Sequence, residues 1–266
     1  MPYARGQHDA LSYTWGSPEK TSRIHLNHGD LAITLNFSAA LSELRTTSEA
    51  RFVWADVICI NQDDIEERNR QIRMMQRIYR QASSVVVWLG DTTDLSTSTV
   101  RNLILPFNYS AESSSWPGTL ILQFPEDILC GLRHLFSRPW WKRIWIVQEA
   151  VAAREIVFIY GGEVIPWRYL QYLCISIQLC EFRREQKTQA LRTCGYRNFA
   201  ALDNFRKHDP MPLLRLLQGT RNYEASDPRD KLYALLGMAS DISSGDLIPD
   251  YSQSVEAIYR HLVRFM

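Results

Sequence analysis

Short runs of apolar, mostly β-branched residues alternate in the first part of the chain with longer amphipathic stretches. The runs predict strands at 10–14, 52–60, 84–90 and 155–160. Apolar and polar residues also alternate on both sides of Asn27-His28-Gly29-Asp30, which predicts a β-hairpin between 23 and 34. Strands that alternate with helices are typical of a mostly parallel sheet with helices on its faces. The pattern therefore predicts an α/β fold with a β-hairpin near the N-terminus.

Apolar residues at helical spacing predict a helix at 64–82. Pro139, which suits a first helical turn, and the absence of breakers up to Ala153 predict a helix at 139–153. Asn36 is expected to cap a shorter helix that ends at Arg45. From Trp167 to the end the pattern is helical, with prolines as the breaks and no convincing strand.

The 266 residues are expected to form a single elaborated domain. Residues 1–165 make up its α/β core, in which residues 91–124, rich in serine and threonine, form a loop insertion. Residues 166–266 are expected to form a helical extension packed on that core.

Composition and charge exclude several classes of protein. With 45% hydrophobic and 22% charged residues, the chain is not intrinsically disordered. The net charge of +1 indicates no general affinity for nucleic acid, although one helix carries a basic stripe at Arg70, Arg73, Arg77 and Arg80. A solvated helix face is the simpler interpretation of that stripe, so nucleic-acid binding is disfavoured.

Five cysteines without a Cys-x-x-Cys pair favour a reducing compartment. The chain begins without an apolar signal segment, and no apolar stretch is long enough to span a membrane. These features predict a cytoplasmic protein.

Glu149 is the one carboxylate in the otherwise apolar segment 144–153. Burying an unpaired carboxylate is costly, which leaves three alternatives. Its pKa is raised, it pairs with Arg143 or Arg154, or it lines a cleft and acts on a ligand. A structural ion pair is the simplest of these, and a catalytic role is the alternative.

Asp56 interrupts the predicted strand 52–60, and Asn61 follows it, at the carboxyl end where parallel sheets bind ligands. Backbone amides or an arginine would also satisfy Asp56. Arg229, which helix capping does not require, is expected to reach Asp56 or Glu149. The acids at the start of the helix 64–82 are explained by capping, so no metal site is predicted. Phosphate-loop, dinucleotide-binding, serine-hydrolase and zinc-protease motifs are absent.

Five ordered blocks of the chain resemble the fungal heterokaryon incompatibility (HET) domain. They are Ala10–Gly16, Trp54–Gln62, Asp64–Gly90, Arg138–Glu149 and Asp227–Gly237. The resemblance implies a role in non-self recognition and regulated cell death in filamentous fungi. It also implies a recognition domain, of NLR type or another type, in the same protein or in a partner.

The order of predicted elements, with Trp145-Ile-Val-Gln-Glu149 before the strand 155–160, is more distantly similar to TIR domains. This similarity implies a flavodoxin-like, mostly parallel sheet. In TIR enzymes that cleave NAD⁺, a Trp-x-x-x-Glu helix supplies the catalytic glutamate, which corresponds here to Glu149. The loop after the first strand would line the nucleotide pocket with Ser12, Tyr13, Trp15 and Gly16. The insertion 91–124 and the helical extension depart from TIR domains.

Cleavage of the nicotinamide–ribose bond passes through an oxocarbenium-like state, and its leaving group is already cationic. One carboxylate facing the ribose is therefore sufficient, without a general acid. Trp15 or Trp145 is expected to stack on a base of NAD⁺, and Arg229 to meet the pyrophosphate. No permanently bound cofactor is predicted, and NAD⁺ enters as substrate.

Two hypotheses follow for function. The first is a cell-death effector that forms a homo-oligomer on activation and hydrolyses NAD⁺ through Glu149. The second is a non-catalytic assembly domain that triggers cell death by recruiting partners, with Glu149 in a structural ion pair.

Overall fold

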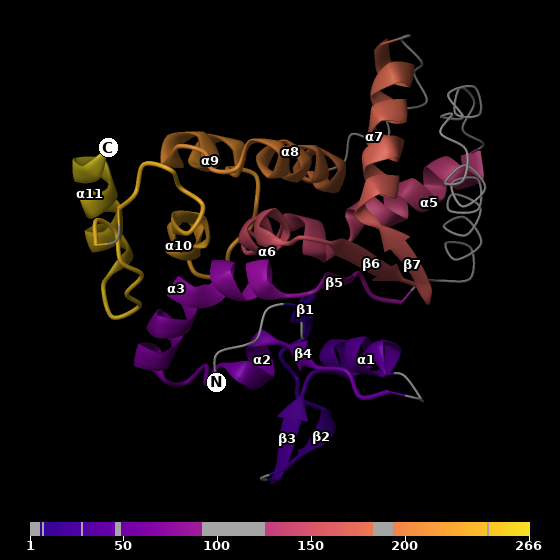
Figure 1. The fold of residues 1–266 in the computed structure, drawn as a ribbon, viewed down its shortest axis with the longest axis horizontal. Helices are drawn as coiled ribbons and strands as arrows, with labels where there is room; N and C mark the ends of the chain where they lie inside the picture. Colours follow the sequence, from indigo (N-terminus) through magenta and orange to yellow (C-terminus); the bar gives the residue numbers. More distant parts are fainter. Residues whose placement is uncertain are drawn as a thin grey trace.

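The computed structural model describes residues 6, 8–27, 29–45, 49–91, 126–182, 194–243 and 245–266 (Figure 1). Its centre is a five-stranded sheet in the order β4-β1-β5-β6-β7. Its strands are β1 (Asp9–Ser12), β4 (Val53–Trp54), β5 (Val85–Trp88), β6 (Ile156–Tyr160) and β7 (Glu163–Pro166). The first four neighbours in this order pair in parallel, and β7 pairs antiparallel with β6. The prediction of an α/β fold with a mostly parallel sheet is therefore confirmed.

The strand order has a consequence for ligand binding. Numbered along the chain, the strands of this sheet follow the order 2-1-3-4-5, which is the flavodoxin-like order. In such sheets the strand order reverses beside the first strand, and ligands bind outside the carboxyl ends of the strands at this point. The segment that follows β1 is accordingly the place to look for a site.

The predicted hairpin is also confirmed, as the antiparallel pair β2 (Ser22–Leu26) and β3 (Gly29–Ile33). The helices of the first part are α1 (Leu35–Leu44), α2 (Asp56–Cys59), α3 (Ile65–Gln81), α5 (Glu126–Ser137), the 3-10 helix η1 (Pro139–Lys142) and α6 (Ile146–Ala152). Those that follow are α7 (Trp167–Phe182), α8 (Cys194–His208), α9 (Leu213–Gly219), α10 (Asp230–Leu236) and α11 (Val255–Phe265).

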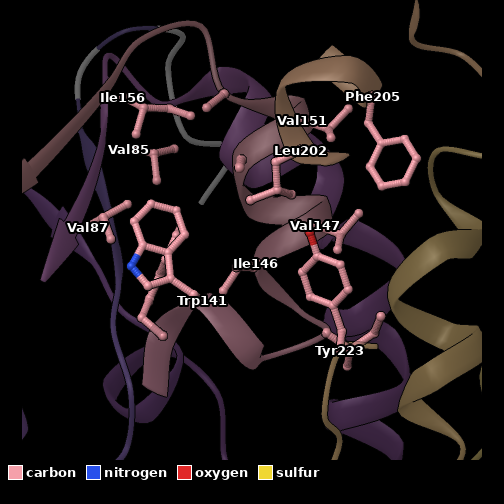
Figure 2. Packing of buried hydrophobic residues seen from close by; sticks show 14 of the residues in the cluster. Val85, Val87, Trp141, Ile146, Val147, Val151, Ile156, Leu202, Phe205 and Tyr223 are labelled. Carbon is pink, nitrogen blue, oxygen red and sulfur yellow. The ribbon is translucent and has the colours of Figure 1, made fainter. Parts of the chain in front are cut away.

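Helices cover both faces of the sheet (Figure 1). Side chains alternate along β1, so that Leu11 packs with Phe37 of α1 on one face. Ala10 faces the other way, into a larger cluster with residues of α3, α6 and α8. Figure 2 shows Leu202 and Phe205 of α8 near Val147 and Val151 of α6. The C-terminal helices therefore share a buried core with the sheet. The division of the domain into a core of residues 1–165 and an extension of residues 166–266 stays a prediction.

The prediction of a strand over 52–60 is wrong for most of its length. Only Val53 and Trp54 are in β4, and the chain then turns into α2, whose first residue is Asp56. A short apolar run does not by itself distinguish a buried strand from a buried helix. The prediction that Asn36 caps α1 is also wrong, because the Oγ1 atom of Thr34 accepts the capping bond from the amide of Phe37 at 3.3 Å.

The predicted helix 139–153 is interrupted. It consists of η1 and α6, separated by an extended Arg143. The amide of Ile144 donates to the carbonyl oxygen of Glu224 at 2.9 Å, so pairing with a distant segment replaces the helical bonds. Gly161 and Gly162 follow β6, adopt φ of 58° and 76°, and turn the chain into β7, which the sequence did not predict.

Residues 92–125, which contain nearly all of the predicted insertion, lie outside the described residues. Among the helices of the described part, none combines the length and apolar character needed to cross a membrane.

The packing of α8 against α5 gives a first prediction. A Cβ atom at Gly195 would lie 2.0 Å from the carbonyl oxygen of Phe136. We expect Gly195→Ala to lower the unfolding free energy by about 1–3 kcal/mol, although alanine otherwise favours a helix by about 1 kcal/mol. Urea denaturation measures the change. Asn204→Ala, at an exposed position of α8, is the control and should change it by less than about 0.5 kcal/mol. Equal stability of both variants would contradict this packing.

Candidate functional site

A cleft of about 720 Å³ lies beyond the carboxyl ends of β1 and β4, a size typical of small-molecule sites. One wall comes from the first part of the chain and includes Thr14, Trp15, Gly16, Asp56, Arg68, Arg143, Trp145 and Glu149. The opposite wall comes from the helical part and includes Glu224, Asp227, Arg229, Asp230 and Tyr251. The cleft is therefore at the point where the strand order predicts a ligand, between two segments far apart in sequence.

Glu149 lies in the first turns of α6 and is 2% exposed. The hydroxyl group of Ser12, at the end of β1, donates a hydrogen bond to its Oε2 atom. The indole N–H of Trp140 in turn donates to the Ser12 Oγ atom at 2.6 Å. This chain of hydrogen bonds fixes the orientation of the carboxylate. The Oε1 atom accepts no hydrogen bond from the described residues, which leaves it available to a ligand in the cleft.

Arg143 supplies the positive charge nearest to this carboxylate. Its guanidinium lies 3.8 Å from Glu149 Oε1 and also donates to the carbonyl oxygen of Tyr13. Of the two arginines considered as partners from sequence, Arg143 thus forms the ion pair. The pair is longer than a hydrogen bond, so Arg143 balances the charge without occupying the carboxylate oxygen.

Burial raises the pKa of Glu149, and Asp56 raises it further, against the opposing effects of Arg143 and Ser12. Burial alone would lower the pKa of Arg143, but the negative charges of Glu149 and Asp56 outweigh burial and raise it. Arg143 therefore stays cationic, while the site favours the protonated form of Glu149 more than water does.

Asp56 starts α2 and is held from two sides. Its Oδ1 atom accepts a bond from the amide of Val57 at 2.8 Å, and Oδ2 accepts the indole N–H of Trp15 at 3.0 Å. Burial, together with the nearby Asp56 carboxylate, raises the pKa of the Tyr13 hydroxyl. Backbone satisfaction of Asp56 was one of the two alternatives read from sequence. The bond from the amide of Val57 provides this backbone satisfaction, and the bond from Trp15 in addition orients a side chain at the rim of the cleft.

Arg229 lines the cleft but does not make the predicted contact with Asp56 or Glu149. It forms an ion pair with Asp227 at 2.7 Å. It also donates to the carbonyl oxygens of Tyr251 and Gln253 at 2.8 and 2.7 Å. Arg229 therefore fastens the segment before α11 to the start of α10.

The structure does not bring Asn61 into the cleft lining; its side chain accepts the amide of Asp63 at 3.2 Å. Gln62 lines the cleft instead, and its amide group donates to the carbonyl oxygen of Asp56 at 3.3 Å. Gly16 borders the cleft with φ of 73°, a conformation that favours glycine. Trp145 precedes α6 and lines the cleft, and its side chain acts to lower the pKa of Asp230 in the opposite wall.

The sequence did not point to Arg68, whose guanidinium carbon lies 3.9 Å from the ring centroid of Tyr251. One signal was present. Arg68 precedes Ile72, Met75 and Tyr79 at helical spacing, so it continues the buried face of α3 rather than the exposed stripe that starts at Arg70. An arginine on an apolar face marks a site or a partner.

The part of the chain that the structure describes contains no group of three or more histidine, cysteine, aspartate or glutamate side chains placed to hold a metal ion. The lining of the cleft supplies three arginines, several aromatic rings and five carboxylates, which are those of Asp56, Glu149, Glu224, Asp227 and Asp230.

A family model described as Heterokaryon incompatibility protein (HET) matches residues 8–149, just over half of the chain. The chain is also similar to heterokaryon incompatibility protein 6, OR allele, from Neurospora crassa, with 28% identity over 303 residues. The similar region covers 92% of this chain and 45% of that protein, so the chain spans about half the length of the relative. No solved structure matches.

The pKa of Glu149 gives a second prediction. Because burial raises it above the value of about 4.3 in an unfolded chain, the folded protein holds this proton more tightly. Wild type therefore loses unfolding free energy as the pH rises from about 4.3 through the folded-state pKa. Glu149→Gln lacks this loss. We expect its stability relative to wild type to increase over that window, in urea denaturation between acid and neutral pH.

Glu19→Gln removes one carboxylate from an exposed loop and serves as the matched control. A stability difference between Glu149→Gln and wild type that stays constant with pH, or that falls as pH rises, would contradict the burial of an ionising Glu149.

Proposed function

The chain belongs to the heterokaryon incompatibility family, and from this we propose that it is a fungal incompatibility domain that triggers cell death by hydrolysing NAD⁺ at the cleft of Glu149. The family supports the role in incompatibility. The chemistry is a proposal that rests on one observation, the buried Glu149 carboxylate held by Ser12 with its second oxygen open to the cleft.

In the proposed reaction the bond between the nicotinamide nitrogen and the ribose C1′ breaks, and its electron pair leaves with neutral nicotinamide. The oxocarbenium-like ribose is stabilised by the negative charge of Glu149. A water molecule then adds its oxygen to C1′, and its proton passes to the carboxylate. A glutamate with a raised pKa accepts this proton more readily than an exposed one. The products are nicotinamide, ADP-ribose and a proton.

The neighbouring groups support the same assignment. Asp56 adds a second negative charge, which favours a cationic nicotinamide in the cleft. The ring of Trp15 is 45% exposed, and the bond from its indole N–H to Asp56 fixes its orientation, so its face is available to stack on a base. Trp145, which also lines the cleft, provides a second aromatic surface.

A second candidate function is supported by the ion pair between Arg143 and Glu149. In a domain without catalysis this pair would serve only to neutralise a buried charge, and cell death would follow from assembly and recruitment of partners. Under either function we propose that the domain forms a homo-oligomer on activation. A recognition domain in the same protein or in a partner would control that step.

The third prediction separates the two functions. Concentrated wild-type protein incubated with NAD⁺ is expected to release nicotinamide, measured by liquid chromatography. Glu149→Gln keeps the size of the side chain and removes the charge that stabilises the transition state. It is expected to lower the rate at least about 100-fold. Glu19→Gln, at an exposed position outside the cleft lining, is the control and should retain the activity.

The same three proteins expressed in fungal cells connect chemistry to phenotype. If Glu149→Gln and wild type cause equal cell death, hydrolysis is not the cause, and the assembly function holds. If wild type releases no nicotinamide even after cross-linking into oligomers, the NAD⁺ hydrolase is ruled out.

A further inference from the structure

The cleft contains three arginines that differ in what they already bind. Arg143 donates to a backbone carbonyl and faces Glu149, and Arg229 is held by Asp227 and two carbonyl oxygens. Arg68 instead rests on the ring of Tyr251 and donates no hydrogen bond to the described residues. A guanidinium has five N–H donors in a planar fork, so all of those of Arg68 are available to a ligand.

The position of Arg68 is fixed even though its donors are free. The guanidinium carbon lies 3.9 Å from the centroid of the Tyr251 ring, close enough for a cation–π contact. That ring is 8% exposed, and its hydroxyl donates to Asp230. The backbone amide of Tyr251 donates to Asn69 Oδ1, next to Arg68 on α3, at 3.1 Å. Arg68 is thus placed before a ligand arrives, which lowers the entropic cost of binding.

None of the described carboxylates forms an ion pair with Arg68, although its charge lowers the pKa of Asp227 and of Asp230. Asp227 is already engaged by Arg229, and Asp230 accepts the hydroxyl group of Tyr251. A preorganised guanidinium with free donors, stacked on an aromatic ring in a cleft, fits a planar pair of anionic oxygens. Phosphate oxygens present such a pair.

We propose that Arg68 binds a phosphate of the ligand, so that the cleft selects phosphate-bearing nucleotides over nucleosides. This inference rests on the proposed function for the identity of the reacting bond, but not for the binding itself. It moves the phosphate contact from Arg229, the residue expected from sequence, to Arg68. Arg229 then has the separate role of holding the wall that carries Tyr251.

The test compares ligands that differ only in phosphate. Isothermal titration calorimetry measures binding of ADP-ribose, inorganic pyrophosphate and adenosine to wild type, Arg68→Gln, Arg68→Lys and Arg70→Gln. Arg70 lies on the same helix with an exposed side chain and outside the cleft lining, so its variant is the matched control. Thermal unfolding of each variant checks that the protein still folds without the cation–π contact. If Arg68→Gln does not fold, Arg68→Lys, which retains the positive charge, takes its place in the comparison.

We expect Arg68→Gln to weaken ADP-ribose and pyrophosphate binding roughly 10- to 100-fold, the loss of a charged hydrogen-bonded pair. Adenosine binding and the Arg70→Gln variant should be unchanged. Arg68→Lys should fall between wild type and Arg68→Gln, because lysine keeps the charge but loses the planar fork. In nicotinamide-release assays, Arg68→Gln should raise KM for NAD⁺ by a similar factor and leave KM for nicotinamide riboside unchanged.

The outcomes separate this inference from the proposed function. If wild type releases nicotinamide but binds ADP-ribose no more tightly than Arg68→Gln does, the hydrolase stands and the role of Arg68 is overturned. Arg68-dependent binding without any release keeps the phosphate site and overturns the hydrolase. Failure of wild type to bind either phosphate ligand at millimolar concentration also overturns the phosphate site.

Discussion

The burial of the Glu149 carboxylate is the constraint that explains much of the local structure around the cleft. An ionised carboxylate with 2% exposure requires hydrogen bonds and a counter-charge, and removing one partner of such a buried pair is strongly destabilising. Ser12 and Arg143 meet these requirements from two directions. Ser12 does so because β1 ends at the switch point of the sheet, where a small polar residue on the α6 face reaches the helix. The geometry of the site is therefore built into the strand order.

The counter-charge also explains the break between η1 and α6. In a continuous helix, Arg143 and Glu149 would be six residues apart, and their side chains would point to different faces of that helix. Instead the backbone at Arg143 is extended and pairs with Glu224, and the amide of Ile144 bonds to the carbonyl oxygen of that residue. This pairing turns Arg143 toward the end of β1. It also anchors the segment that forms the opposite wall of the cleft, so one local feature serves both charge balance and cavity formation.

Most of the fold was accessible from sequence because apolar periodicity is a local signal: β1, β5, β6, α3 and the hairpin follow from it directly. The errors occurred where tertiary contacts override local preference, at α2 and at the break before α6. For the site, Glu149 was evident as a lone carboxylate in an apolar segment. Arg229 was misassigned because its partner Asp227, two residues away, competes with every distant carboxylate. Arg68 was missed because its ring partner Tyr251 is distant in sequence.

The two walls of the cleft come from parts of the chain that the family model treats differently. The match ends at residue 149, so it contains Ser12, Asp56 and Glu149, whereas the wall with Tyr251 lies beyond it. Contacts of Arg143, Trp145 and Arg68 join the first wall to the second. Because each of these contacts crosses the cleft or borders it, the packing of the two walls sets the width of the cleft. Glu149 and Arg68 both lie in the first wall, whereas the ring of Tyr251 that supports Arg68 lies in the second, so the packing of the two segments positions Arg68 relative to Glu149.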